Sequence, residues 1–424
     1  MKHNVKGLGL LAVMMAFLVG ADSGTRALAQ DANALRNIQV DDYFALKSVG
    51  SPRISPDGAW VAYTVRTKDL ENDRSETRLW MVSIAGGEAL AMTAKGSSVW
   101  RPRWSPDGKY LTFMASTKGQ SSQVFTLDLR GGERAQLTNI EGGIGGYKWS
   151  PDGKRLLLTI SDKIEEKSDG PWVIDQLKFK QDYVGYLNRQ RTHLYVHDLE
   201  AKTTIQITNG DYDDYGATWS QDGSKIAFVS NRTAEPDASS NTDIWLVDPG
   251  TPYDQQEPVR VTTNPGTDGS PIWHPDGERI GYLMTYTDRT DIPASYLQTK
   301  VAIIRIGEDE PVLLTTEALD RKAWDPIFSP DGSQIYVQLE DDGQVQLAAV
   351  SVADGELSRL ITGQVQVGAT AVAPDGSVVV AISKPRLPGD LFVLDANPPA
   401  GSEQPRRLTD VNGELLNSIW LSDV

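Results

Sequence analysis

The sequence contains no cysteine, which excludes disulfide bonds and thiolate metal sites. It has no cluster of basic residues, and 57 acidic against 41 basic residues give a net charge of −16. Nucleic acid is therefore not an expected partner. The apolar run at residues 8–19 is too short to span a membrane. With 23% charged and 39% hydrophobic residues, the composition is that of a globular protein.

The N-terminus has the pattern of a secretory signal peptide. Lys2 and Lys6 precede the apolar residues 8–19, and the Ala-Leu-Ala of residues 27–29 matches a cleavage site. No cysteine follows this site, so a lipid anchor is not expected. We therefore expect residues 1–29 to be removed and the mature protein to be periplasmic or secreted, without membrane attachment after cleavage.

A Ser-Pro-Asp-Gly sequence, or a close variant, recurs seven times between an apolar segment and an alternating strand pattern. The intervals between successive copies are 50, 45, 70, 54, 55 and 44 residues. Repeats of roughly 40–55 residues that carry only strand signals are typical of β-propellers. Two further strand signals complete each repeat, so the sequence predicts an all-β, seven-bladed β-propeller with four-stranded blades. The seven aspartates are Asp57, Asp107, Asp152, Asp222, Asp276, Asp331 and Asp375.

The Asp-Gly pair of every repeat is interpreted as turn chemistry. Proline presets φ, aspartate accepts a local hydrogen bond, and glycine adopts the positive φ that follows. Calcium binding by these aspartates would need several oxygens at one ion, whereas the repeat supplies one aspartate per blade. We therefore predict no metal and no cofactor. A large apolar residue two positions before the proline is expected to pack between blades: Ile54, Trp104, Trp149, Trp219, Trp273, Phe328 and Val372.

The propeller is predicted over residues 49–410. The repeat frame opens with an inner-type strand and closes with an outer-type strand, so no strand remains to join the last blade to the first. We expect these two blades to meet through side-chain packing, without a shared sheet. An N-terminal segment at residues 30–48 includes a short amphipathic helix at residues 40–47. Residues 411–424 are expected to be the stub of a linker to a missing domain, which is identified below as a hydrolase.

Four apolar residues at the two ends of the ring have no place in the repeats. We predict that they contact a neighbouring domain, because exposed apolar patches promote association. They are Tyr43, Phe44, Leu416 and Trp420.

An insertion at residues 161–190 accounts for the 70-residue interval. Long propeller loops lie on the faces of the ring, where ligands bind. The alternative is an insertion that packs its own aromatic residues against the ring. An acidic loop at residues 211–215 is either a receptor for a peptide amine or a solvated turn. Candidates for the substrate channel in or beside the insertion are Trp172, Asp175, Tyr186, Arg189 and Arg191.

Several segments together resemble the N-terminal β-propeller of bacterial prolyl oligopeptidase-family serine peptidases, in the acylaminoacyl-peptidase and dipeptidyl-peptidase branch. The likeness covers nearly all of residues 38–420. It implies that the propeller gates access of peptides to the serine of an α/β-hydrolase domain. The segments are Val-Asp-Asp-Tyr-Phe-Ala-Leu-Lys at 40–47, Ser-Pro-Arg-Ile-Ser-Pro-Asp-Gly at 51–58, Pro-Trp-Val-Ile-Asp at 171–175 and Arg-Thr-His-Leu-Tyr at 191–195.

The chain has no Gly-x-Ser-x-Gly elbow, which a hydrolase of this kind needs for its nucleophile. His193, His197 and His274 are expected to be structural. We therefore predict no catalytic residue and no activity of this chain alone, with the hydrolase domain missing or supplied in trans. The expected substrates of the assembly are short or N-terminally blocked peptides.

Two other classes of function stay open. One is a periplasmic Tol-like propeller that serves as a protein-binding scaffold without chemistry. The other is a propeller glycosidase or lyase, which would need paired carboxylates facing the channel. The sequence alone does not identify such a pair.

Overall fold

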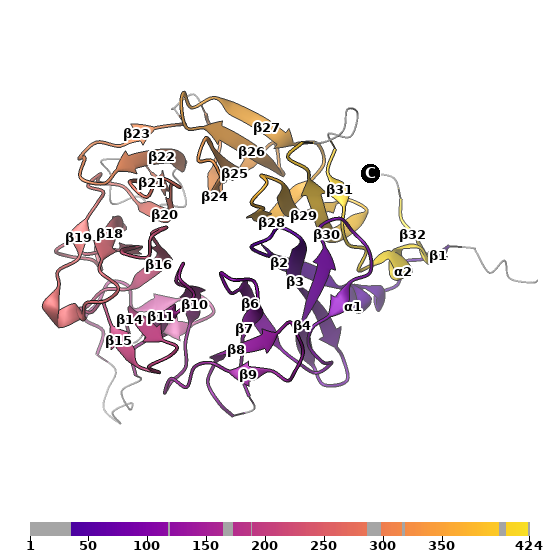
Figure 1. Cartoon of the computed structure of the whole chain (residues 1–424). Helices are drawn as coiled ribbons and strands as arrows, with labels where there is room; N and C mark the ends of the chain where they lie inside the picture. Colours follow the sequence, from indigo (N-terminus) through magenta and orange to yellow (C-terminus); the bar gives the residue numbers. More distant parts are fainter. Residues whose placement is uncertain are drawn as a thin grey trace, which may run out of the picture.

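The computed structural model describes residues 35–117, 119–163, 173–187, 189–285, 298–315, 319–397 and 404–422. These residues form β-strands almost throughout, arranged as a ring of sheets around a central opening (Figure 1). The described helical elements are α1 (Asp42–Ala45), the 3-10 turn η1 (Tyr253–Gln255) and α2 (Gly413–Leu416). Within the described ranges no helix has the length and apolar character needed to cross a membrane. The predicted all-β propeller with four-stranded antiparallel sheets is confirmed.

Five four-stranded antiparallel sheets follow one another along the described part of the chain. The first two are β2 (Ser48–Ile54), β3 (Trp60–Asp69), β4 (Arg74–Ser83), β5 (Leu90–Ala91), and β6 (Val99–Trp104), β7 (Tyr110–Ala115), β8 (Gln123–Asp128), β9 (Ala135–Gln136). The third is β10 (Gly146–Trp149), β11 (Arg155–Ser161), β14 (Thr192–Asp198), β15 (Thr204–Gln206). The fourth and fifth are β16 (Asp214–Trp219), β17 (Ile226–Ser230), β18 (Asp243–Val247), β19 (Val259–Arg260), and β20 (Asp268–Trp273), β21 (Arg279–Met284), β22 (Lys300–Arg305), β23 (Val312–Leu313).

Two further four-stranded sets complete the ring and share one sheet. A single parallel pair, Val345 with Gln366, joins β26 of one set to β28 of the next. The first strand of every set lies nearest the central opening (Figure 1). The two sets are β24 (Ala323–Phe328), β25 (Gln334–Asp341), β26 (Gln344–Ser351), β27 (Leu357–Ile361), and β28 (Gln366–Val372), β29 (Val378–Lys384), β30 (Leu387–Leu394), β31 (Arg406–Arg407).

The Ser-Pro-Asp-Gly turns connect the first and second strands of the sets. In the second set the Ser105 hydroxyl donates to Asp107 Oδ1 over 2.6 Å and accepts the Tyr110 N–H over 3.0 Å. Gly108 follows with a φ of 70°. All seven turn aspartates accept the backbone N–H two residues further on, and the donors are Ala59, Lys109, Lys154, Ser224, Glu278, Ser333 and Ser377.

The repeated large apolar residues lie between neighbouring sheets. Trp104 packs with Leu79 of the first sheet and Leu111 of its own. In the same way, Trp219 lies between the third and fourth sheets, and Trp273 lies between the fourth and fifth. The alternation of apolar side chains on both faces of each sheet thus builds one core cluster between each pair of neighbours.

The first and last sets meet through side chains. Val61, Tyr63 and Val65 of β3 share a core cluster with residues of β29 and β30. The Arg406 guanidinium also donates to the carbonyl oxygen of Ile84 over 3.0 Å. Among the described strands, no backbone pair joins the β2–β5 sheet to the β28–β31 set.

The two ends of the chain are held to each other beside this junction, at the right edge of Figure 1. β1 (Arg36–Asn37) pairs in parallel with β32 (Ile419–Trp420). The Asn412 side chain bonds both backbone groups of Lys47, accepting over 2.8 Å and donating over 2.9 Å. The sequence analysis gave these segments no partner within the chain, because their contacts join residues from opposite ends of it.

The four predicted domain-contact residues differ in exposure. Tyr43 and Trp420 are 63% and 56% exposed, whereas Phe44 and Leu416 are half-buried. Lys68 Nζ lies 3.3 Å from the centre of the Tyr43 ring. α1 covers only part of the helix expected at residues 40–47, since Leu46 has an extended ψ of 129°.

Candidate functional site

The insertion forms a small hairpin on the ring. β12 (Lys180–Gln181) pairs with β13 (Gly185–Tyr186), and the rings of Phe179 and Tyr186 stack 6.3 Å apart. Asp175, Tyr186 and Arg189 are exposed, and the Arg189 guanidinium forms an ion pair with the Asp175 carboxylate. Trp172 lies outside the described residues.

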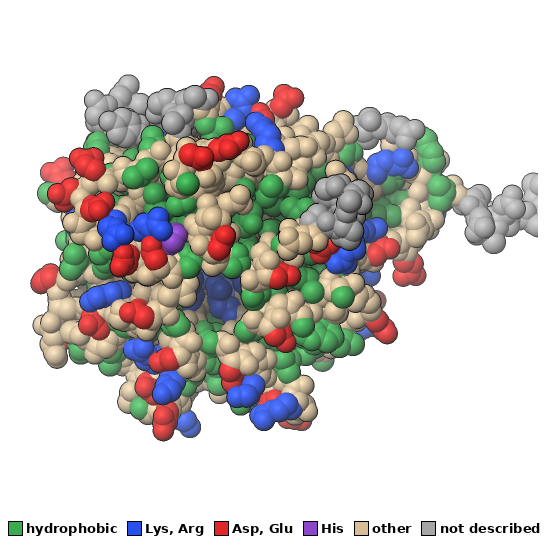
Figure 2. Space-filling view, turned by 45° about the horizontal axis from the view of Figure 1, so that its top comes forward, with side chains coloured by type: hydrophobic (Ala, Val, Ile, Leu, Met, Phe, Trp, Pro, Cys, Tyr) green, Lys and Arg blue, Asp and Glu red, His purple; other side chains and the backbone are tan. Residues whose placement is uncertain are grey.

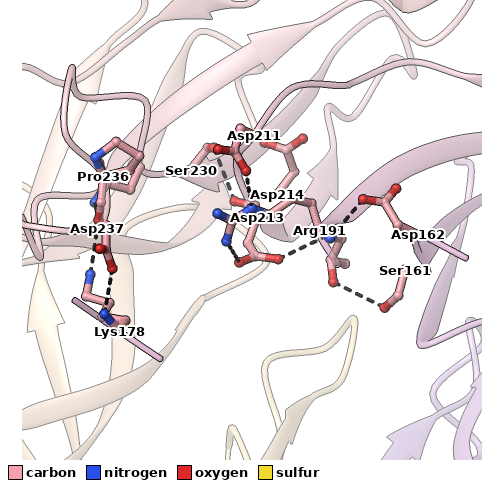
Figure 3. Close-up of polar contacts among 12 residues, drawn as sticks. Ser161, Asp162, Lys178, Arg191, Asp211, Asp213, Asp214, Ser230, Pro236 and Asp237 are labelled. Carbon is pink, nitrogen blue, oxygen red and sulfur yellow. Dashed lines mark hydrogen bonds and ion pairs between the residues drawn. The ribbon is translucent and has the colours of Figure 1, made fainter. Parts of the chain in front are cut away.

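Arg191, at the base of the insertion, is bound by the acidic loop (Figure 3). Its Nε donates to Asp211 Oδ1 over 2.7 Å, and its Nη1 lies 3.6 Å from Asp213 Oδ2. The backbone N–H of Thr192 donates to Asp213 Oδ1 over 3.0 Å. Asp211 and Asp213 of the loop therefore already pair with Arg191 of the same chain.

A second contact holds the insertion to the loop that follows β17. The Lys178 N–H donates to Asp237 Oδ1 over 2.8 Å, and its ammonium donates to the carbonyl oxygens of Pro236 and Ser239, each over 3.0 Å (Figure 3). Together with the acidic loop these residues enclose a cavity of about 260 Å³. Sequence reasoning missed Lys178 and Asp237, because about 60 residues separate them and neither belongs to the repeat.

The three histidines among the described residues, His193, His197 and His274, are buried and hydrogen-bonded. His193 Nδ1 lies 3.2 Å from Asp214 Oδ2, and Arg232 donates to the other oxygen of Asp214 over 2.8 Å. His197 bonds the Thr204 hydroxyl at 2.8 Å, and His274 lies 3.2 Å from the carbonyl oxygen of Gly332. No serine side chain is hydrogen-bonded to a histidine in the described ranges.

We expect Arg191→Gln to loosen the insertion without unfolding the ring. The substitution removes the ion pairs with Asp211 and Asp213, whose carboxylates are largely exposed, so the expected loss is about 1 kcal/mol. Chymotrypsin should cut the insertion, which carries the fully exposed Tyr183, several times faster than in the unmodified protein. The matched control is Arg189→Gln, whose ion pair is solvent-exposed and contributes little. Equal cleavage rates for the two variants would contradict the role given to Arg191.

The central channel holds a second cluster, which the sequence analysis did not single out. One residue before six of the seven large apolar residues of the repeat, the first strands place a side chain against the channel. These side chains line two cavities of about 400 and 660 Å³ that share Thr218 and Trp219. Asp175, Tyr186, Arg189 and Arg191 line neither cavity. In chain order the channel residues are Arg53, Arg103, Lys148, Thr218, Ile272 and Ile327.

The channel is therefore basic on one side. Arg53, Arg103 and Lys148 belong to three consecutive sheets, and Figure 2 shows Lys and Arg side chains deep in the central hollow. Arg101 lies near them but lines neither cavity: its Nη1 lies within 2.5 Å of where a Cβ on Gly146 would stand, and its charge acts on Arg103 and Lys148. Glycine at position 146 thus leaves room for the guanidinium. Arg53, Arg103 and Lys148 each stand one residue before the large apolar residue of their repeat. Comparing this position between repeats would have revealed the basic cluster from the sequence.

Comparisons with known proteins agree with the fold. A family model described as the TolB beta propeller domain matches residues 31–167. The chain is 26% identical over 423 residues to the uncharacterized peptidase YuxL of Bacillus subtilis, covering 91% of this chain and 60% of that protein. It is 25% identical over 441 residues to dipeptidyl-peptidase 5 of Porphyromonas gingivalis, covering 97% of this chain and 61% of that protein.

This propeller resembles those of peptidases. The resemblance predicted from the sequence is thereby confirmed, and the chain spans about three-fifths of the length of these relatives. An acylaminoacyl peptidase bound to Z-Gly-Gly-Phe-chloromethyl ketone superposes with a TM-score of 0.69 at 19% identity, over 90% of this chain and 55% of that one. The propeller domain of the Trilobed protease from Pyrococcus furiosus superposes with a TM-score of 0.60 at 18% identity, over 86% of this chain and 99% of that one. These two structures support the peptidase-type propeller as a fold.

Proposed function

We propose that this chain is the substrate-gating propeller of a secreted serine peptidase that acts on short or N-terminally blocked peptides. The observation that carries the proposal is the match of nearly the whole chain to peptidases that extend beyond the matched part. The nucleophile belongs to an α/β-hydrolase domain, because no Gly-x-Ser-x-Gly elbow occurs in this sequence. The propeller admits peptides through its channel or past the face that carries the insertion.

The proposal includes the finer organisation of the chain. Residues 1–29 are a signal peptide, and residues 49–410 form a seven-bladed ring that closes by packing. Residues 30–48 are an N-terminal helical segment and residues 411–424 the start of the linker to the hydrolase domain, which Tyr43, Phe44, Leu416 and Trp420 contact. The exposure of Tyr43 and Trp420 supports this part. Mass spectrometry of the exported protein should then find Gln30 as the first residue.

The gating role is tested with a chimera. This propeller replaces the matched region of the Porphyromonas gingivalis dipeptidyl-peptidase 5, and hydrolysis of short peptides is compared with that of unfolded casein. We expect short peptides to be hydrolysed and casein to be excluded. Equal hydrolysis of both would contradict gating. The chain alone should show no fluorophosphonate labelling, and labelling of one of its serines would contradict the assignment of the nucleophile to another domain.

A protein-binding scaffold is the second candidate. The match of residues 31–167 to the TolB-type family model favours it. Deletion of residues 30–48 and 411–424 would separate the two candidates through solubility if these segments lay outside the ring. The structure weakens that test, because Val411 packs in the core between the first and last sets and Asn412 is buried. Deletion is therefore expected to destabilise the ring under either function.

A further inference from the structure

Four cations share one side of the channel and have no carboxylate partner. None of Arg53, Arg101, Arg103 and Lys148 forms an ion pair within the described part of the chain. Other cations are paired with buried carboxylates, such as Arg232 with Asp214, Arg260 with Asp243 and Arg407 with Asp390. Because acidic residues outnumber basic residues in this protein, four neighbouring cations without a carboxylate partner are unexpected.

The hydrogen-bonding groups of the cluster are largely free. Arg53 donates only to the carbonyl oxygen of Pro52, and its buried Nε has no partner. Arg103 donates to the carbonyl oxygen of Tyr147 through Nε, which leaves both of its Nη groups available. Arg101 and Lys148 have no protein acceptor among the described residues. Of these donors only the Nε of Arg53 is fully buried, and an unpaired buried donor costs stability unless a ligand or water satisfies it.

The cations also repel one another. Burial first, and then the charges of Arg103, Arg53 and Arg101, lower the pKa of Lys148 to about 7. Burial and its neighbours lower the pKa of Arg103 to about 10. The carboxylate of Asp325 is the one acidic group that acts on Arg53, and it is already hydrogen-bonded to Gln338. Asp325 therefore offsets only part of the positive charge.

A left-handed residue three positions before the large apolar residue recurs in the first strands, at Ser51, Arg101, Ser270 and Asp325. Arg101 and Asp325 have φ values of 52° and 54°, in the left-handed region that non-glycine residues rarely adopt. At both places the pairing of the first strand with the second shifts register. Such bulges redirect side chains.

We propose that Arg53, Arg101, Arg103 and Lys148 bind the carboxylate group of a peptide inside the central channel. Guanidinium groups match a carboxylate through two parallel hydrogen bonds. Trp104, Trp149 and Trp219 line the same cavity and offer apolar contact area for peptide side chains. The cavity of about 400 Å³ is within the range of small-ligand sites. The choice of a peptide as the carrier of the carboxylate rests on the proposed function.

The test measures binding to the full chain by calorimetry. The probes are N-acetyl-Ala-Ala-Phe with a free C-terminal carboxylate and the same peptide as its C-terminal amide. We expect the acid to bind at least about tenfold more tightly than the amide, and added salt to reduce this preference. Equal affinity for the two peptides, or no binding of the acid at millimolar concentration, would overturn the inference. Inorganic phosphate that binds as tightly as the acid would overturn the assignment to a peptide.

Two variants locate the site. The double substitution Arg103→Gln with Lys148→Gln should abolish the preference for the acid, and Lys225→Gln, at an exposed turn lysine, should retain it. Because the double variant removes mutually repelling charges, we expect its Tm to be unchanged or raised. A double variant that is folded and keeps the preference would contradict the assignment, and Arg53→Gln alone provides the same test if the double variant does not fold. The readout needs no hydrolase domain, so a failed chimera and a failed carboxylate preference remain separate results.

Discussion

Asp268→Asn is expected to stabilise the protein above neutral pH by several kilocalories per mole. Asp268 is fully buried at the start of β20. Its Oδ1 accepts a hydrogen bond from Asn264, and its Oδ2 has no partner. Burial first, with a contribution from Asp243, raises the pKa of Asp268 to about 7. The ionised carboxylate is therefore an unfavourable group at this place.

The sign of the pH dependence follows from that raised pKa. Below about pH 4, Asp268 is protonated in both the folded and the unfolded protein. As the pH rises to about 7, the unfolded chain loses the proton first, so folding becomes less favourable through this window. A shift of this size corresponds to about 4 kcal/mol of unfolding free energy. Well above pH 7 the full loss of unfolding free energy has occurred.

Urea unfolding between pH 4 and 8 measures this effect. We expect the stability of Asp268→Asn relative to the unmodified protein to increase from about pH 4 to about pH 7, because the amide does not ionise. Asp309→Asn, at an exposed carboxyl in the loop between β22 and β23, is the matched control and should show no such increase. If the unfolding free energies of Asp268→Asn and the unmodified protein depend on pH in the same way, the pKa of Asp268 is not raised in the folded protein.

Asp390→Ala is expected to destabilise the closure of the ring by about 3–5 kcal/mol. The Asp390 carboxylate is fully buried in β30. It accepts hydrogen bonds from Arg407 over 2.5 Å, from the Thr409 hydroxyl over 2.7 Å and from the Val411 N–H over 3.1 Å. Its removal leaves the Thr409 hydroxyl, the Val411 N–H and the Nε of Arg407 without their acceptor, whereas the Nη2 of Arg407 keeps Asp410.

Asp410→Ala is the matched control for this prediction. Asp410 bonds the same guanidinium of Arg407 over 2.5 Å, but its side chain is 55% exposed. Its loss should therefore cost no more than about 1 kcal/mol. Denaturant unfolding gives the two values, and proteolysis near the chain ends reports whether β1 and β32 separate. Equal losses for the two variants would contradict the buried role of Asp390.

The Asp-Gly turns and the tryptophans between sheets were predictable because the interactions that fix them are local and repeated. Ser105, Asp107 and Tyr110 lie within six residues, so their bonds can be inferred from the sequence alone. The same holds for the resemblance to peptidase propellers, which the comparisons confirm.

The contacts of the insertion were less predictable. Its position at the face of the ring follows from its length, but the sequence does not say which residues it meets. The sequence predicts Arg191 as a contact for substrate but does not reveal its bond to Asp211, which only the structure shows. Lys178 binds the loop at Pro236 and Asp237 because the third and fourth sheets are neighbours. Such pairings depend on the arrangement of whole blades.

By itself the sequence determined the propeller fold, its repeating turns and the packing residues, since each depends on hydrogen bonds and apolar contacts that recur at a fixed spacing. Only the tertiary structure decided which residues from distant parts of the chain lie together. It brought Arg53, Arg103 and Lys148 to one side of the channel and joined Arg36 to Ile419. The physical reason is closure: a ring makes neighbours of residues that are far apart in the chain, and no local pattern encodes those distances.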